Sequence, residues 1–188
     1  MAEDYRVVLF CSRNKDNKDV PNFKQRAKHF VAKGSDYIGQ AFDDFLVEGV
    51  PGEVSRFYMS VNRRDSKRIR DNLMMRMLNQ HDDFDPTKMN AMLVSVAASA
   101  DCALDHNWLF DLDYYEADLP EPTDEEVHQM FSKYVNPESL KILPTVHGLT
   151  VISPTHFDTR ELLKTYPWIT LKKDDMMLVA WGERMENN

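Results

Sequence analysis

An apolar run closes on two acids in the stretch Trp108-Leu109-Phe110-Asp111-Leu112-Asp113. Its aromatic and aliphatic residues favour a β-strand. Side chains at positions i and i+2 of a strand point to the same side. The carboxylates of Asp111 and Asp113 are therefore predicted to project from one face, while Phe110 and Leu112 face a core on the other.

Downstream of this strand, a capping box at Thr123-Asp124-Glu125-Glu126 predicts the start of a helix. Two apolar segments on either side of His147-Gly148 predict a hairpin with a tight turn. The elements predicted there are a helix from 124 to about 134, hairpin strands over 142–146 and 149–153, a short helix over 158–164, and a closing pair of strands over 168–171 and 176–181.

Upstream of it, strands and helices alternate, as apolar periodicity and turn residues indicate. The elements predicted there are a strand over 6–11, a polar loop over 12–22, a short helix over 23–32, a helix capped by Ser35 and ending at Val47, a strand over 56–61, a basic helix after Asn62 with an apolar stripe at Ile69, Leu73, Met74, Met77 and Leu78, and a helix that begins at Asp85-Pro86.

This order of elements predicts an α+β fold, with a mixed, largely antiparallel sheet and helices packed on one face. A doubly wound parallel sheet fits less well, and the chain has neither a dinucleotide-binding glycine motif nor a P-loop sequence. The length of 188 residues suits a single α+β domain over 1–188, with residues 1–50 as an arm or cap of the main domain.

The composition is that of a folded protein, with 43% hydrophobic and 11% aromatic residues. No apolar run reaches the roughly 18 residues of a membrane span, and the N-terminus lacks a basic start followed by an apolar core. We therefore expect no membrane helix and no secretory signal. Cys11 and Cys102 form neither a metal spacing nor a C-x-x-C pair, so two buried free thiols in a cytoplasmic protein are expected.

The net charge of −8 is unevenly distributed, because residues 56–76 are basic and the rest of the chain is strongly acidic. Overall acidity argues against non-specific coating of nucleic acid. A local basic patch fits contacts with a few phosphates or docking to an acidic partner. Arg63, Arg64 and Lys67, near the first turn of the predicted basic helix, are the candidate phosphate-binding residues. A solvated charged face is the alternative.

Asp111 and Asp113 are the first candidate site. Two carboxylates on one face suit joint coordination of Mg²⁺ or Mn²⁺, because these ions prefer oxygen ligands and share them with substrate phosphates. Asp175, or its neighbour Asp174, is the candidate third metal ligand. The alternatives are a strand end that meets solvent and an ordinary acidic turn between strands.

His147, at the tip of the predicted hairpin, is the second candidate. Gly148 beside it permits a turn at little steric cost. The imidazole could reach a phosphate or donate a proton. The alternative is an ordinary exposed histidine in a turn.

Three segments resemble, in this order, those of small phage-type proteins related to the archaeo-eukaryotic primase-polymerase superfamily. They are residues 56–62, 108–113 and 145–158, and the resemblance spans residues 56–181. It implies an RRM-like catalytic core with Asp111 and Asp113 as metal ligands and a third acid on a later strand. Thr150 stands where the nucleotide-contacting histidine of that superfamily is expected, and His147 lies on the other side of the glycine.

Two functions from different classes follow. In the first, the chain is a metal-dependent nucleotide- or nucleic-acid-binding domain that performs nucleotidyl transfer on a nucleoside triphosphate. The residues assigned to it are Asp111, Asp113 and His147 for catalysis, and Arg63, Arg64, Lys67 and Thr150 for phosphate. In the second, it is a catalytically inactive phage protein of the host cytoplasm that binds a basic host or phage protein through its acidic surface. A nucleotide-binding module without turnover is the third possibility.

Overall fold

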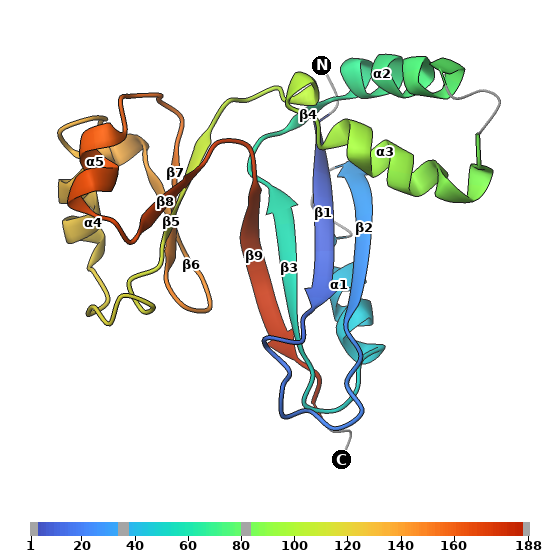
Figure 1. Ribbon diagram of the computed structural model, residues 1–188, viewed down its shortest axis with the longest axis horizontal. Coiled ribbons are helices and arrows are strands. Elements are labelled where there is room, and N and C mark those ends of the chain that lie inside the picture. Colours follow the sequence, from blue (N-terminus) through green and yellow to red (C-terminus); the bar gives the residue numbers. More distant parts are fainter. Residues whose placement is uncertain (1–3, 34–37, 80–83, 186–188) are drawn as a thin grey trace. The chain divides into compact units, whose positions relative to one another are not determined.

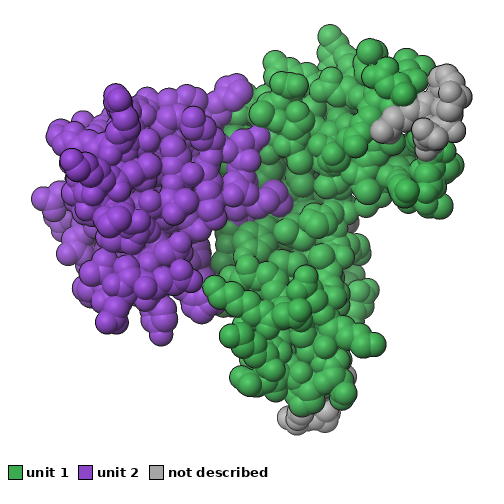
Figure 2. Space-filling model, viewed as in Figure 1, with its two compact units in different colours: residues 1–105, 178–188 green, residues 106–177 purple. Residues whose placement is uncertain are grey.

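The computed structural model describes residues 4–33, 38–79 and 84–185. The chain forms two compact units, unit 1 (residues 1–105 and 178–188) and unit 2 (residues 106–177), which are coloured separately in Figure 2. The predicted α+β class is confirmed, but the strands form two antiparallel sheets rather than one. The primase-polymerase-like segment expected over 56–181 is divided between the two units.

Unit 1 contains a sheet in the order β2-β1-β3-β9, with the short strand β4 paired to β1 (Figure 1). Its elements are β1 (Asp4–Ser12), β2 (Arg26–Lys33), α1 (Ile38–Val47), β3 (Val54–Ser60), β4 (Arg64–Asp65), α2 (Ser66–Asn79), α3 (Met89–Ala97) and β9 (Met176–Glu183). Helix α1 presents a buried stripe at Ile38, Phe42 and Phe45, which packs on the sheet against Phe10 and Phe57.

A buried carboxylate ties together one end of this sheet. Glu53 is 2% exposed and precedes β3. It accepts hydrogen bonds from Ser12 Oγ at 2.5 Å, from Arg26 Nε at 2.6 Å and from the backbone N–H of Val50 at 3.0 Å. Because Ser12 ends β1 and Arg26 begins β2, this one side chain links two strand ends to the loop before β3.

Unit 2 has the element order strand, helix, strand, strand, helix, strand. The elements are β5 (Trp108–Leu112), α4 (Asp124–Phe131), β6 (Lys141–Pro144), β7 (Leu149–Ser153), α5 (Arg160–Thr165) and β8 (Ile169–Lys172). The sheet order is β6-β7-β5-β8, so the first and third strands of the unit lie in the centre and every pairing is antiparallel. This is the arrangement of ferredoxin-like and RRM-like folds. The predicted RRM-like sheet is therefore confirmed for unit 2.

One face of this sheet is covered by both helices (Figure 1). Phe110, Leu112 and Val151 point from the central strands into a core that they share with Phe131 of α4 and Leu162 of α5, and all five side chains are fully buried. Helix α4 begins at the predicted capping box, in which the Thr123 and Glu126 side chains each accept a hydrogen bond from the other residue's backbone N–H. The prediction of helices on one face is confirmed here.

One predicted element and one predicted strand pairing are wrong. Residues 23–32 were expected to be helical, but most of them form strand β2, which pairs with β1 from Tyr5↔Lys33 to Ser12↔Arg26. As an edge strand, β2 has only partly buried or exposed side chains, so its sequence lacks the alternation of a half-buried strand. The strands predicted as a closing pair, β8 and β9, belong to different sheets, because β8 pairs with β5 and β9 lies beside β3.

The predicted cap Ser35 lies outside the described residues. Within the described part of the chain, no helix is both long and apolar enough to cross a membrane. Cys11 and Cys102 are free and buried, as predicted.

Candidate functional site

The face of the unit 2 sheet opposite its helices, here called the helix-free face, carries a row of polar side chains. Asp111 on β5 lies between Thr150 on β7 and Thr170 on β8 in the strand register. Residues directly opposite each other in an antiparallel pair share a face. Thr150 is 4% exposed, whereas Asp111 is half-buried and Thr170 is exposed. The register thus brings together two predicted residues, Asp111 and Thr150, that are 39 positions apart in the sequence.

Lys172, two residues beyond Thr170, lies on the same face and pairs with Asp111. Its Nζ donates a hydrogen bond to Asp111 Oδ2 at 2.8 Å. Burial lowers the pKa of Lys172, but the hydrogen bond and the charge of Asp111 outweigh it, and the pKa is raised above its ordinary value. The charges of Asp175 and Asp113 act in the same direction. Lys172 is therefore a protonated ammonium among carboxylates.

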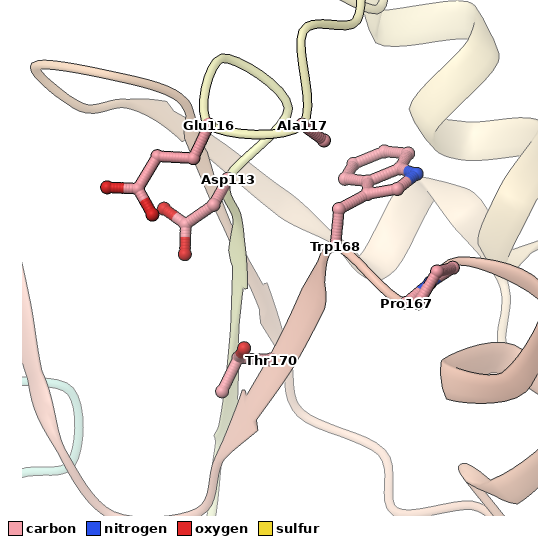
Figure 3. Close-up of a pocket in the computed structure, with 6 residues that line it drawn as sticks. All are labelled: Asp113, Glu116, Ala117, Pro167, Trp168 and Thr170. Atoms are coloured by element: carbon pink, nitrogen blue, oxygen red, sulfur yellow. The ribbon is translucent and has the colours of Figure 1, made fainter.

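Asp113 contributes to a pocket at the end of the same face. The backbone N–H of Asp113 donates to the carbonyl of Trp168 at 3.1 Å, which extends the pairing of β5 with β8 beyond the strand end. The pocket has a volume of about 390 Å³ and is lined by Asp113, Glu116, Ala117, Pro167, Trp168 and Thr170. Figure 3 shows the carboxylates of Asp113 and Glu116 on one side and the indole of Trp168 with Pro167 on the other. The pocket thus has an acidic wall and an apolar wall.

A largely exposed acidic segment, residues 113–126, continues from this pocket into α4. It contains seven carboxylates and no lysine or arginine. Tyr115 and Leu119 in the same segment are 71% and 43% exposed, so apolar side chains stand among the charges. Such a mixture is typical of surfaces that bind proteins.

The turn that carries His147 lies against the end of β5. The backbone N–H of Thr145 donates to the carbonyl of Gly148 at 2.9 Å and closes the turn. A Cβ at Gly148 would lie 2.2 Å from the backbone oxygen of Leu112, so only glycine permits this approach. His147 itself is exposed, and its ring centroid is 6.0 Å from that of Tyr115.

The predicted phosphate-binding cations lie in unit 1 and are largely engaged there. The guanidinium of Arg63 donates to Asp105 at 2.7 and 2.8 Å and to Asp4 at 2.9 Å, and these hydrogen bonds and charges raise its pKa. Arg64 belongs to β4 rather than to the helix and is 2% exposed. Lys67 lies on α2 with its side chain exposed. Among these three, Lys67 alone retains a mostly solvent-exposed cation.

The arrangement around Asp111 is a poor fit to a divalent ion. A metal held jointly by Asp111 and Asp113 needs their carboxylate oxygens, and Lys172 already occupies one oxygen of Asp111. Asp175 lies in the turn after β8, where one of its oxygens accepts the backbone N–H of Met176 at 2.7 Å. No group of three or more His, Cys, Asp or Glu side chains in residues 4–33, 38–79 and 84–185 could hold a metal ion.

No protein-family model, curated protein or solved structure matches this chain. The helix-free face and the pocket are the features of the molecule whose chemistry bears on its function.

Several site residues were not predicted from the sequence, among them Lys172, Glu116 and Trp168. The alternation of the segment 168–172 already places Trp168, Thr170 and Lys172 on one side of a strand. The sequence does not show which strand this segment pairs with, because β8 pairs with β5 across some 60 residues of chain.

Proposed function

We propose that this chain is a non-catalytic binding protein that docks a basic segment of a partner protein into the pocket beside Asp113. The observation that supports this proposal is the pair of unlike walls in the pocket. A lysine or arginine side chain has an apolar stem and a cationic head. Pro167 and Trp168 suit the stem, and the carboxylates of Asp113 and Glu116 suit the head.

The surroundings of the pocket favour a basic partner over an anionic ligand. Asp111 and Asp175 add negative charge on the same side of the unit, and Lys172 is held by its hydrogen bond to Asp111. The acidic segment 113–126 extends this field beyond the pocket and would attract a basic protein, such as one that binds nucleic acid. A phosphate group without a cation would be repelled from it.

Removing the acidic wall is expected to abolish most of this binding. The Asp113→Asn/Glu116→Gln variant should bind a short arginine-rich peptide about tenfold more weakly than the wild type, because two charge-assisted contacts are lost. Tryptophan fluorescence titration at fixed ionic strength measures the affinity. Glu138→Gln/Glu161→Gln, which removes two exposed carboxylates elsewhere in unit 2, is the charge-matched control and should bind like the wild type.

A second variant separates docking from general attraction between opposite charges. Trp168→Ala leaves the charge unchanged but removes the apolar wall, so we expect it to weaken binding several-fold. Circular dichroism establishes whether this variant is folded, since Trp168 also packs on the core of unit 2. Equal affinities for the wild type, the double variant and Trp168→Ala would rule out docking in the pocket.

Metal-dependent nucleotide binding is the second candidate, favoured by the position of Asp111 on the first strand of an RRM-like unit. It requires Lys172 to release Asp111 when nucleotide and cation bind. Calorimetric titration of Mn²⁺ in the presence of a nucleoside triphosphate tests it. Binding that disappears in Asp111→Ala/Asp113→Ala would support this function, and absence of binding to the folded wild type would retire it.

A further inference from the structure

Lys172 is the central charge of the helix-free face. Its ammonium bonds to Asp111 at 2.8 Å, and Asp113 and Asp175 are close enough to act on it electrostatically. One positive charge that the chain itself supplies is therefore hydrogen-bonded to Asp111 and attracted by two further carboxylates. The side chain of Lys172 is 37% exposed and that of Asp111 is 23% exposed, so the pair is only partly screened by solvent.

The neighbouring lysine, Lys173, carries the same charge as Lys172 but has different surroundings. Lys173 follows Lys172 directly but lies in the bend after β8, which ends at Lys172. The Nζ of Lys173 lies 5.5 Å from the ring centroid of Trp108, and no hydrogen bond to Asp111 links it to the carboxylates. Lys173 thus provides a matched control for the loss of one positive charge.

We propose that the ammonium of Lys172 takes the place of a divalent cation on the helix-free face, and that it closes this face to Mg²⁺ and Mn²⁺. A cation bound to Asp111 would have to approach within the hydrogen-bonding distance that Lys172 already occupies. The repulsion between the ammonium and the incoming ion opposes that approach. Removal of the ammonium leaves Asp111 and Asp113 on one face as a pair of oxygen ligands. This inference does not depend on the docking of a basic partner.

Mn²⁺ titration followed by electron paramagnetic resonance, with no nucleotide present, tests the proposal. The wild type and Lys173→Ala are expected to leave Mn²⁺ free. Lys172→Ala is expected to bind it at least about tenfold more tightly, because a like charge beside the ligand oxygen is gone. Lys172→Glu, with a third carboxylate at the same position, should bind more tightly still. Adding Asp111→Asn to Lys172→Ala should remove the gain.

Circular dichroism identifies variants that are folded, and Lys172→Gln replaces Lys172→Ala if the latter unfolds. Binding of Mn²⁺ by the wild type that is lost in Asp111→Asn would overturn the proposal. A folded Lys172→Ala or Lys172→Gln that gains no affinity for Mn²⁺ would overturn it as well, as would an equal gain in Lys173→Ala.

Discussion

Replacing Glu53 with alanine is expected to lower the free energy of unfolding by about 3 kcal/mol, because a buried charge loses its partner and further donors lose their acceptor. The Arg26 guanidinium would keep its charge without the carboxylate at 2.6 Å, and Ser12 and the backbone N–H of Val50 would lose theirs. Urea denaturation measures the change. Glu48→Ala, which removes an exposed carboxylate 3.8 Å from the same arginine, should change stability by no more than about 1 kcal/mol.

The same carboxylate predicts how stability changes with pH. Burial raises the pKa of Glu53, but hydrogen bonds from Ser12, Val50 and Arg26 outweigh burial and leave the pKa below the ordinary value of 4.5. The folded state therefore binds fewer protons than the unfolded chain. The stabilisation is fully present above the unfolded pKa and is lost as the pH falls through the folded pKa. Glu53→Gln should flatten the loss of stability below pH 4.5, and an unchanged slope would contradict the assignment.

Replacing Gly148 with alanine is expected to destabilise unit 2 by about 3 kcal/mol, at the upper end of the usual cost of overpacking. The added methyl group would lie 2.2 Å from the backbone oxygen of Leu112, and a backbone atom cannot move aside as a flexible side chain can. The turn carrying His147 would have to leave the end of β5. Thermal unfolding monitored by circular dichroism measures the effect.

Gly39→Ala is the control for this change. A Cβ at Gly39 meets no atom within 4 Å, and Gly39 lies on helix α1, so alanine should stabilise the chain by up to about 1 kcal/mol. A Gly148→Ala variant as stable as the wild type would mean that the hairpin does not pack against β5 in this way.

Local signals in the sequence were enough for many of the elements. The capping box at Thr123 and the strand that carries Asp111 are each recognised from a few consecutive residues. Both occur where they were predicted. Strand β2 could not be recognised in this way, because an edge strand gains its conformation from pairing with β1 rather than from its own pattern. The prediction that β8 and β9 form a hairpin was wrong for a related reason. Two strands on either side of an acidic turn have the same sequence pattern whether or not they pair with each other.

The site depended even more on contacts between distant residues. Asp111 could be selected from its strand, but its partner Lys172 is 61 residues away. The pocket combines the segment after β5 with the residues before and within β8, so its acidic and apolar walls come from separate parts of the chain. As an arginine in a basic segment, Arg63 was a reasonable candidate for binding phosphate. Its ion pairs with Asp105 and Asp4 could be found only from the structure.

The path of the chain has a consequence for biosynthesis. Unit 2 is continuous in sequence, whereas unit 1 is interrupted by it and receives strand β9 only after residue 177 has been made. On the ribosome, all the strands of unit 2 can form before β9 is available to pair with β3. Until then, the free edge of β3 can pair with a strand of another nascent chain. Pairing of β9 (Met176–Glu183) with β3 closes that edge, so β3 is exposed to other nascent chains until this strand has been synthesised.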